Sequence, residues 1–368
     1  MKEKIFFYIF FLSILNNIFS KNDSSNFIEE EFKKFIIKYN KTYSTKEEYL
    51  KRLKIFNSTF NEIIKHNKNH TFNYGINFFS DLTEKEFKKY SSGSLIKTIN
   101  NNISYSYSFF NSQPSNESEE LPKSFDYRNI DGKGKSAVNE VVTQGNCGSC
   151  VIFSIISLIE AYYFKIKNRL EKFSEQQIVD CLYDDREICD EGSYEKDVLK
   201  YIKKKGVMLD KIYPYVSGET KKKTNCKYNE TNVITYIPGY QKEDHPKNIN
   251  IKKNLFKFGP ILTMINGLCI RNYEKNIIDF TKDECPNSFK DMNHDVTIIG
   301  WDYDNETSTE YWIVRNSWGK YWGMDGYMYV KCGENIIGIE NEIFFISSNY
   351  LNVKKIVFVS IFMIFNLF

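Results

Sequence analysis

The first sign of chemistry in this chain is a cysteine at the start of an apolar run. The segment Gln144-Gly-Asn-Cys147-Gly-Ser-Cys150 leads into residues 151–166, which are long and apolar enough for a buried helix. Cys150 would then lie in the first turn, where unpaired N–H groups and the helix dipole favour a thiolate over a thiol. The thiolate is the attacking species in nucleophilic catalysis by cysteine. A buried cysteine alone is more often structural, so this assignment needs a partner.

The spacing of Cys147 and Cys150 also fits a redox pair or part of a zinc site. Redox pairs lie on one helix turn of a thioredoxin-type fold, and no such pattern surrounds these residues. The chain has only 4 histidines, too few to complete a paired zinc site. We therefore expect neither a metal nor a cofactor, and we interpret Cys150 as the candidate nucleophile.

The histidines identify a candidate base by elimination. His66 and His70 lie far upstream of Cys150, and His245 lies in a polar stretch with the composition of an exposed loop. His294 stands where a polar turn enters a predicted strand of alternating apolar residues, a suitable place for a base that points into a cleft. We expect His294 to be the base.

A candidate for orienting that imidazole follows on the next predicted strand. Residues 311–315 form an apolar strand that leads directly to Asn316 and Trp318. An asparagine oxygen can accept from one imidazole nitrogen and leave the other facing sulfur. Trp318 could shield that hydrogen bond from water.

Composition places these residues in an ordinary globular protein. The chain has 368 residues, 42% of them apolar and 26% charged, with a formal net charge of +3. This balance excludes a disordered chain and makes nucleic acid a poor candidate partner. The length predicts two domains or one large domain with appendages. All 8 cysteines lie at or after Cys147, so the first 120 or so residues have a different role from the rest.

Both ends of the chain carry apolar segments. Residues 1–20 have a basic start and a short apolar stretch, the pattern of a secretory signal peptide. This predicts an oxidising compartment with disulfides, and the Asn-x-Ser/Thr sequons are candidate glycosylation sites. Residues 356–368 form a mostly apolar tail that fits an anchor signal, a membrane-dipping segment or a simple hydrophobic extension. The sequence leaves these three alternatives open.

The region before the cysteines reads as two amphipathic helices within residues 27–67. Along the second, six positions fall within one arc of roughly 100°: Glu48, Arg52, Phe56, Thr59, Ile63 and Asn67. Glu48 and Arg52 also form a favourable i,i+4 pair. Periodicity alone fits a surface helix with a core stripe equally well. The next segment, Gly75-Ile-Asn77-Phe-Phe79-Ser-Asp81, decides between these readings.

Together the helix pattern and this segment resemble the two signatures of the pro-region of papain-family cysteine peptidases of the cathepsin L-like type. Five of the six helix positions match, with Thr59 in place of an asparagine, and the second signature matches throughout. In that family the pro-region lays an extended segment through the active cleft, backwards relative to substrate. The resemblance implies a zymogen. The polar residues 91–120 are then expected to form an exposed linker open to cleavage.

From about residue 121 to 348 the chain resembles the peptidase itself. The resemblance implies an α+β, two-lobed papain-like fold, with a helical lobe, a β-barrel-like lobe and the cleft between them. It implies Cys150 as nucleophile, His294 as base, Asn316 as orienting residue and Gln144 as side-chain donor to the oxyanion, beside the backbone N–H of Cys150. Its partners would be protein or peptide substrates, its own pro-region and cystatin-type inhibitors.

Two positions depart from the family pattern. Val151 replaces the aromatic residue that normally follows the nucleophile, which could reduce activity. The usual Cys-Asn-Gly-Gly loop reads Cys189-Asp-Glu191-Gly192, so a glutamate stands on the rim of the S3 region beside Gly192. The disulfides implied by resemblance are Cys147–Cys189 and Cys181–Cys226. The family's third bridge is rewired here, and our prediction is Cys269–Cys285 with Cys332 free.

A specificity residue follows from the tail of the domain. The segment Gly338-Ile-Glu-Asn-Glu342 resembles the corresponding part of cathepsin B, where the last position forms the floor of the S2 pocket. A carboxylate there pairs with an arginine head while apolar walls hold its stem. We expect Glu342 to admit Arg at P2 beside Phe or Leu, with walls formed by Tyr194, Met264 and Met292. The alternative is a surface glutamate. No insertion resembles the occluding loop of cathepsin B, which favours an endopeptidase.

The expected organisation is a signal peptide (1–20), an inhibitory pro-region with its linker (21–120), a peptidase domain (121–348) and a hydrophobic tail (349–368). The expected function is a cysteine endopeptidase made as a zymogen. Its location would be the secretory pathway, in a lysosome- or vacuole-like compartment or outside the cell, with membrane anchoring through the tail left open. The alternative is a papain-fold binding protein of weak or no activity, which the two departures motivate.

Overall fold

The computed structural model describes residues 21–91, 93–95 and 121–347. The predicted signal peptide, residues 96–120 of the linker and the hydrophobic tail lie outside these described residues. Within the described ranges, no helix combines the length and apolarity that a membrane crossing requires.

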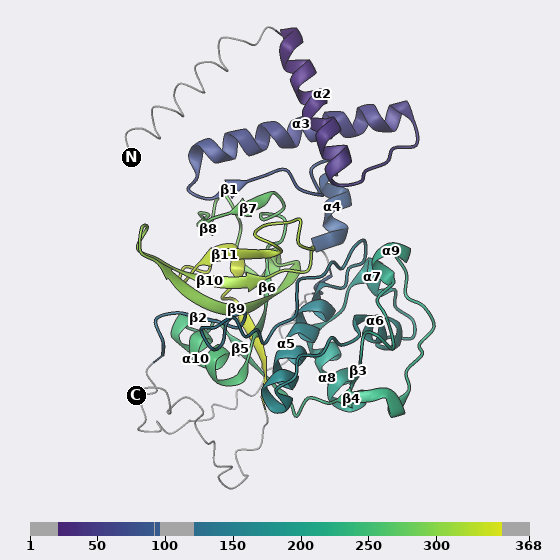
Figure 1. The fold of residues 1–368 in the computed structure, drawn as a ribbon, viewed down its shortest axis with the longest axis vertical. Coiled ribbons are helices and arrows are strands. Elements are labelled where there is room, and N and C mark those ends of the chain that lie inside the picture. The colour runs from purple at the N-terminus through teal and green to yellow at the C-terminus, as the bar shows by residue number, and fades with distance from the viewer. Residues whose placement is uncertain (1–20, 92, 96–120, 348–368) are drawn as a thin grey trace.

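The N-terminal module consists of three helices and one short strand (Figure 1): α2 (Lys21–Lys38), α3 (Lys46–Asn69), β1 (Asn73–Tyr74) and α4 (Glu84–Ser91). The helix α3 begins after Thr45, whose side chain accepts the backbone N–H of Glu48 at 3.1 Å and so caps the first turn. The module has a small aromatic core of its own, made by Phe32, Phe35, Tyr39 and Phe56. The two predicted helices are therefore present, with a break at residues 39–45.

An ion-pair network joins the helices of this module. Arg52 contacts Glu48 at 2.6 Å along the same helix, as the spacing predicts. The guanidinium of Arg52 also makes a bidentate pair with Glu86 on α4, at 2.7 and 2.8 Å. Asp81 accepts from Lys41 at 2.9 Å and from Tyr43 at 2.9 Å. These contacts hold α4 in a fixed position relative to α3.

The helical lobe surrounds one central helix, α5 (Cys150–Lys167), which is buried along most of its length. The other helices of the lobe are α6 (Glu175–Cys181), α7 (Ile188–Glu191), α8 (Glu195–Lys205) and α9 (Ser217–Thr220). A small sheet pairs β3 (Val207–Met208) with β4 (Val233–Thr235), preceded by the 3₁₀ turn Glu230–Asn232. Ser174 caps α6 by accepting the backbone N–H of Gln177 at 3.0 Å.

The strand-rich lobe is built on an eight-stranded sheet in which β2 (Phe125–Asp126) pairs with β9 (His294–Asp304). The remaining strands follow the order β5 (Tyr240–Asp244), β12 (Glu342–Ile346), β6 (Ile261–Ile265), β9, β10 (Thr309–Arg315), β11 (Tyr327–Lys331) and β8 (Ile277–Ile278). Helix α10 (Asn248–Phe258) and the 3₁₀ turns Phe289–Asp291 and Ile336–Gly338 complete the lobe, and β7 (Tyr273–Lys275) pairs with β1 of the N-terminal module.

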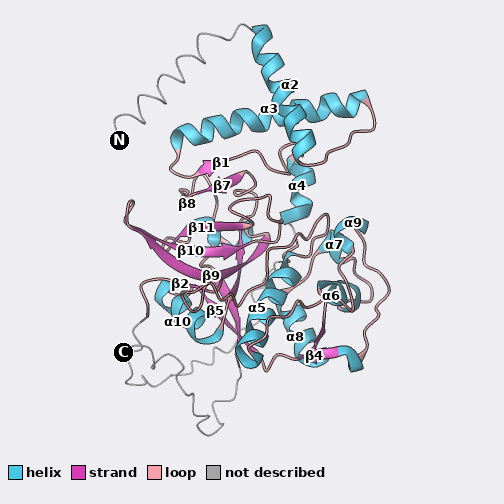
Figure 2. Ribbon diagram, viewed as in Figure 1, coloured by secondary structure: helices cyan, strands magenta, loops and turns pink. Residues whose placement is uncertain are grey.

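This sheet is open and does not close into a barrel. In the part of the chain that the structure describes, the end strands β5 and β8 do not pair with each other. The strand β8 has two residues and pairs only with β11, so it offers too few backbone groups to continue the sheet. Figure 2 shows most strands gathered in this lobe and helices α5 to α9 in the other, so the prediction of an α+β protein with two lobes is confirmed.

The two lobes meet where α5 packs against β9. The hydroxyl of Thr297 on β9 donates to the carbonyl of Ser154 on α5 at 3.3 Å. The N-terminal module covers the strand-rich lobe, and α4 runs from it toward the junction of the lobes (Figure 1). The start of α5, the start of β9 and the end of α4 are thereby brought to one region.

Three disulfides are present among the described residues. They join Cys147 to Cys189, Cys181 to Cys226 and Cys269 to Cys285, the pairs expected from the sequence, and Cys332 is free and half-buried. The first bridge holds the segment before α5 against α7.

Candidate active site

Cys150 is the first residue of α5 and is fully buried. The backbone N–H groups of Asp295, Val151 and Gly93 hydrogen-bond to its sulfur. Burial raises the pKa of the Cys150 thiol well above its ordinary value and outweighs these three donors. The thiol is therefore held in its protonated form in this structure.

His294 is the first residue of β9, and its side chain is held by Asn316. The distance from Nε2 of His294 to Oδ1 of Asn316 is 2.8 Å. The same Oδ1 accepts the backbone N–H of Ser317 at 2.8 Å, so it is the amide oxygen that faces the ring and Nε2 that carries the proton. Nδ1 of His294 has no hydrogen-bond partner among the described residues, and it is the nitrogen left to accept a proton.

The surroundings of His294 are dry. Burial lowers the pKa of its imidazole to about 4, against the opposing effect of the hydrogen bond to Asn316. The indole of Trp318 stacks on the imidazole with a centroid distance of 4.6 Å and an interplanar angle of 29°. His245, by contrast, is exposed on the loop after β5. The structure therefore brings His294, and not His245, to the neighbourhood of the buried thiol.

Gln144 is fixed at both ends of its amide group. Its Oε1 accepts the hydroxyl of Ser317 at 2.6 Å, and its Nε2 donates to the carbonyl of Cys147 at 2.9 Å. The same Nε2 donates to the carbonyl oxygen of Tyr90 at 3.2 Å, and the indole N–H of Trp318 donates to that oxygen at 3.1 Å. A carbonyl from the N-terminal module thus occupies the donors beside the thiol.

Residues 93–95 lie across the sulfur as an extended strand. Ser193 donates its backbone N–H to the carbonyl of Gly93 at 3.0 Å, and Leu95 donates to the carbonyl of Ser193 at 3.3 Å. Ser94 and Ser193 form a parallel bridge. A Cβ at Gly93 would stand 2.7 Å from the sulfur of Cys150 and 2.5 Å from the carbonyl oxygen of Gly148, so only glycine fits here.

This placement corrects one expectation. Residues 91–120 were expected to form an exposed linker, but Ser91, Gly93 and Ser94 are buried against the rest of the chain. The polar composition of the segment indicates solvent exposure, whereas backbone pairing with Ser193 satisfies its N–H and C=O groups inside the cleft.

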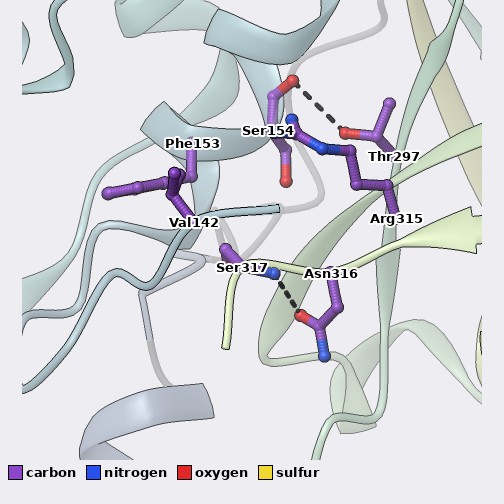
Figure 3. Close-up of a pocket in the computed structure, with 7 residues that line it drawn as sticks. All are labelled: Val142, Phe153, Ser154, Thr297, Arg315, Asn316 and Ser317. Carbon is purple, nitrogen blue, oxygen red and sulfur yellow. Dashed lines mark hydrogen bonds between the residues drawn. The ribbon is translucent and has the colours of Figure 1, made fainter. Parts of the chain in front are cut away.

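A small cavity lies behind Asn316, between α5 and strands β9 and β10 (Figure 3). Its lining comprises Val142, Phe153, Ser154, Thr297, Arg315, Asn316 and Ser317. Within the described part of the chain, Nδ2 of Asn316 and Nε of Arg315 have no hydrogen-bond partner. This polar cavity lies on α5 beyond the nucleophile and does not include Cys150, so it is separate from the groove that residues 93–95 fill.

Comparison with known proteins is consistent with this geometry. Residues 121–347 match the description "Papain family cysteine protease". Residues 32–87 match the "Cathepsin propeptide inhibitor domain". The chain belongs to the papain family of cysteine proteases. It carries an inhibitory pro-region and is therefore a zymogen of that family.

Relatives cover nearly the whole chain. It is 32% identical over 344 residues to the viral cathepsin of Autographa californica nuclear polyhedrosis virus, covering 93% of this chain and 98% of that protein. It is 32% identical over 335 residues to cysteine proteinase 1 of Dictyostelium discoideum, covering 85% and 91%. The procathepsin L 3 of Tenebrio molitor larval midgut aligns with a TM-score of 0.71 at 26% identity, covering 87% and 99%. The stem bromelain precursor aligns with a TM-score of 0.72 at 27% identity, covering 88% and 99%.

Of the expected substrate-binding residues, Met264 and Gly192 contact the segment 93–95. Met264 contacts the hydroxyl of Ser94 at 2.9 Å through its sulfur. Glu342 is buried and forms an ion pair with Lys242, so it is not a surface glutamate. Met292 is buried beside Gly338, and Gly192 approaches Gly93 so closely that a Cβ at Gly192 would stand 2.4 Å from its carbonyl oxygen. Tyr194 precedes α8 and stacks with the guanidinium of Arg186 at 5.5 Å.

Sequence reasoning missed two groups of residues near the thiol. The first group, Tyr90 and Gly93, belongs to the part of the pro-region that covers the thiol. Its position directly after the second pro-region motif is the feature of the sequence that could have identified it. The second is a pair of carboxyl groups, Glu195 and Asp295. Asp295 directly follows the candidate base, yet only the pairing of β9 with β6 reveals which face its side chain occupies. No group of three or more metal-ligating side chains occurs within the described ranges.

Replacing Gly93 with alanine should loosen the pro-region from the cleft. Gly93 has no left-handed backbone, so the cost comes from contact of the added methyl with the sulfur and with the Gly148 carbonyl. Overpacking of this kind costs about 1–3 kcal/mol, or roughly 5- to 150-fold in docking equilibrium. Reaction of the Cys150 thiol of the unprocessed zymogen with an epoxide inhibitor at neutral pH should accelerate by about that factor. Ile37→Ala, at an exposed position of the same module, should leave the rate unchanged, and an unaltered rate for Gly93→Ala would contradict the assignment.

A stack of rings couples the pro-region to the strand-rich lobe. The ring of His66 on α3 lies 3.5 Å from that of Tyr74 and 3.9 Å from that of His70. Nε2 of His70 contacts Glu284 of the peptidase domain at 2.8 Å. Burial, together with the neighbouring His70, lowers the pKa of His66 to about 4, and Nε2 of His66 has no hydrogen-bond partner among the described residues.

Acid should therefore weaken docking of the pro-region through His66. Its pKa in the docked state lies below the ordinary value of about 6.5, so the docked state favours neutral imidazole. The contribution of His66 to docking is intact above pH ~6.5 and is lost as pH falls toward 4. His66→Phe keeps the stack without the charge, so conversion of zymogen to mature enzyme should slow at pH 5 and be unchanged at pH 7.5, as followed by gel or intact mass. His245→Asn is the control, and equal slowing at both pH values would refute a titration effect.

Proposed function

We propose that this protein hydrolyses peptide bonds through Cys150, His294, Asn316 and Gln144. The observation that carries the proposal is that the backbone N–H of Asp295, the residue after His294, hydrogen-bonds to the sulfur of Cys150. Nucleophile and base come from different lobes and are held next to each other at this contact. The hydrogen bond between His294 and Asn316 leaves Nδ1 of the imidazole on the remaining side of the ring.

In the proposed reaction, the Cys150 thiolate attacks the carbonyl carbon of the scissile peptide bond, and the carbonyl oxygen takes the negative charge. Nε2 of Gln144 and the backbone N–H of Cys150 stabilise that oxyanion. Nδ1 of the His294 imidazolium gives its proton to the leaving amine as the C–N bond breaks, which leaves a thioester. Water then attacks the thioester carbon while Nδ1 takes its proton, the C–S bond breaks, the carboxylic acid product leaves, and the thiolate and imidazolium of the enzyme are restored.

The buried form is inactive for an electrostatic reason. Removing charges from water is costly unless they are well paired, and here burial favours a neutral thiol and a neutral imidazole. Departure of residues 93–95 would admit water to both groups and free the donors that Tyr90 occupies. The N–H groups of Asp295 and Val151 and the dipole of α5 would then favour the thiolate.

The expected domain boundaries are part of the proposal. The pro-region match ends at residue 87 and the peptidase match begins at residue 121, so cleavage within residues 96–120 would separate the two. The three disulfides support synthesis in the secretory pathway after removal of residues 1–20. A lysosome- or vacuole-like or extracellular location, inhibition by cystatin-type proteins and membrane association through residues 349–368 belong to the same proposal.

A catalytically weak binding protein is the second candidate, motivated by Val151 in place of an aromatic residue. Val151 is fully buried on α5 within the core of the helical lobe. Loss of an aromatic ring there changes the packing beneath the nucleophile and leaves the sulfur, imidazole and amide groups in place.

Labelling should separate the two candidates. After acid processing, an epoxide inhibitor should add one equivalent to Cys150, because the thiolate forms once the pro-region leaves, and intact mass should report a single adduct. Cys150→Ala should remain unmodified. The free thiol of Cys332 is an internal control, since burial raises its pKa and keeps it unreactive. Absence of any adduct under every activation condition would favour the binding protein.

We further propose that Glu342 contributes to acceptance of Arg at P2, beside Phe and Leu. Met264 and Met292 offer apolar walls, and burial raises the pKa of Glu342 against the opposing effect of Lys242. Glu342→Ala removes the carboxylate and leaves Lys242 without that partner. The kcat/KM for a P2-Arg substrate should therefore fall about tenfold or more relative to a P2-Phe substrate. Glu334→Ala, at an exposed position, should change neither, and an equal loss on both substrates would remove the role of Glu342.

A further inference from the structure

Two carboxyl groups, with a methionine between them, lie on one face of three neighbouring strands of the sheet. Met264 on β6 pairs directly with Asp295 on β9, and residues directly opposite in an antiparallel pair share a face. Ile343 on β12 pairs with Thr263 on β6, so the same register sets Glu342 beside Met264. Asp295 and Glu342 therefore flank one methionine on a single face of the sheet.

A third carboxyl group completes the cluster from the other lobe. Glu195 is the first residue of α8 and is only 6% exposed. The hydroxyl of Ser94, in the middle of the covering segment, donates to Oε1 of Glu195 at 3.3 Å and contacts the sulfur of Met264 at 2.9 Å. The carboxyl groups of Glu195 and Glu342 lie close enough to Asp295 for electrostatic repulsion between the three groups. The side chain of Ser94 thus occupies a pocket with carboxyl groups on three sides.

The charges in this pocket are unevenly balanced. Lys242 forms ion pairs with Glu342 and with Asp244, so the Glu342 carboxylate already has a cation beside it. Among the described residues, no lysine or arginine lies within salt-bridge distance of Asp295 or Glu195, and Lys242 acts on the Glu195 carboxylate only from farther away. Asp295 is 0% exposed, and within the described part of the chain the Ser94 hydroxyl is the one hydrogen-bond donor that acts on its carboxyl group.

A fully buried carboxyl group whose one donor is a neutral hydroxyl is unfavourable for the fold, because that contact replaces little of the lost hydration. Ser94 belongs to the segment that leaves on activation, and its departure opens the face that Asp295 shares with Met264. A cationic side chain entering there would supply the missing donors, and the methionine would hold its aliphatic stem. A guanidinium suits two carboxyl groups on different walls, because it presents several N–H donors in a planar fork.

We propose that Asp295 and Glu195 form the cation-recognising wall of the P2 pocket, so that they, more than the Lys242-paired Glu342, select Arg at P2. This rests on the proposed peptidase function and extends it to two residues of this chain. A short polar residue, Ser94, fills the same place in the zymogen without a charge. In the zymogen the pro-region therefore closes the pocket with the neutral hydroxyl group of Ser94. A P2 arginine carries a positive charge and would bind the carboxyl groups more strongly than this hydroxyl does.

The test compares kcat/KM for a matched pair of peptide substrates that differ only in Arg or Leu at P2. Titration with an epoxide inhibitor gives the concentration of active enzyme and so corrects for misfolded protein. Because both substrates are measured on the same enzyme, effects on the neighbouring His294 cancel in the ratio. Asp295→Asn and Glu195→Gln should each lower the Arg/Leu ratio about tenfold, because a neutral amide replaces a charge-assisted contact. Glu306→Gln, in the exposed turn between β9 and β10, is the control and should leave the ratio unchanged.

The outcomes are separable. No turnover of either substrate, with no adduct at Cys150, would refute the peptidase function itself. Turnover of the Leu substrate without turnover of the Arg substrate in the wild type would overturn the inference alone. So would an Arg/Leu ratio that stays unchanged in both Asp295→Asn and Glu195→Gln. If one of these variants fails to process, the other still decides the question, since the two carboxyl groups come from different lobes.

Discussion

The structure depends on the contact between the start of α5 and the start of β9. One places a sulfur at the N-terminus of a helix, and the other places an imidazole and a backbone N–H beside it. Neither lobe holds both groups. The packing of α5 against β9, including the hydrogen bond from Thr297 to Ser154, is therefore the condition for any chemistry at Cys150. The hydrogen bond from His294 to Asn316 then fixes which imidazole nitrogen is available.

The burial that brings these groups together also keeps them catalytically inactive. In the zymogen the thiol and imidazole are removed from water, and both are neutral because charged forms are costly in such surroundings. The pro-region achieves this with main chain rather than side chains. Gly93 crosses the sulfur with no Cβ, and the carbonyl of Tyr90 occupies donors of Gln144 and Trp318. The bridge between Ser94 and Ser193 is parallel. The segment therefore runs in the direction opposite to that of a chain paired antiparallel with Ser193, which is consistent with an inhibitor that lies backwards in the cleft.

Docking of the pro-region joins two different kinds of contact. Ion pairs such as Arg52 with Glu86, and the stack of His66 on Tyr74, are internal to the pro-region. The interface is spanned by hydrogen bonds from the edges of this stack, between Nε2 of His70 and Glu284 and from the Tyr74 hydroxyl to the carbonyl of Cys269. Nε2 of His66 is buried without a hydrogen-bond partner among the described residues, so we expect acid to weaken this interface.

The sequence by itself determined the family, the two lobes, the helices of the pro-region, three disulfide pairs and the residues around Cys150, because short motifs with fixed spacing carry that information. Four histidines were enough to single out His294, since the others stood in unsuitable segments. Only the tertiary structure decided that the sheet stays open, that residues 93–95 are buried and that Asp295, Glu195 and Glu342 share one pocket. Those features arise from pairing between residues about 50 to 100 positions apart or more. Strand register and lobe packing set such pairings, and neither leaves a local pattern in the sequence.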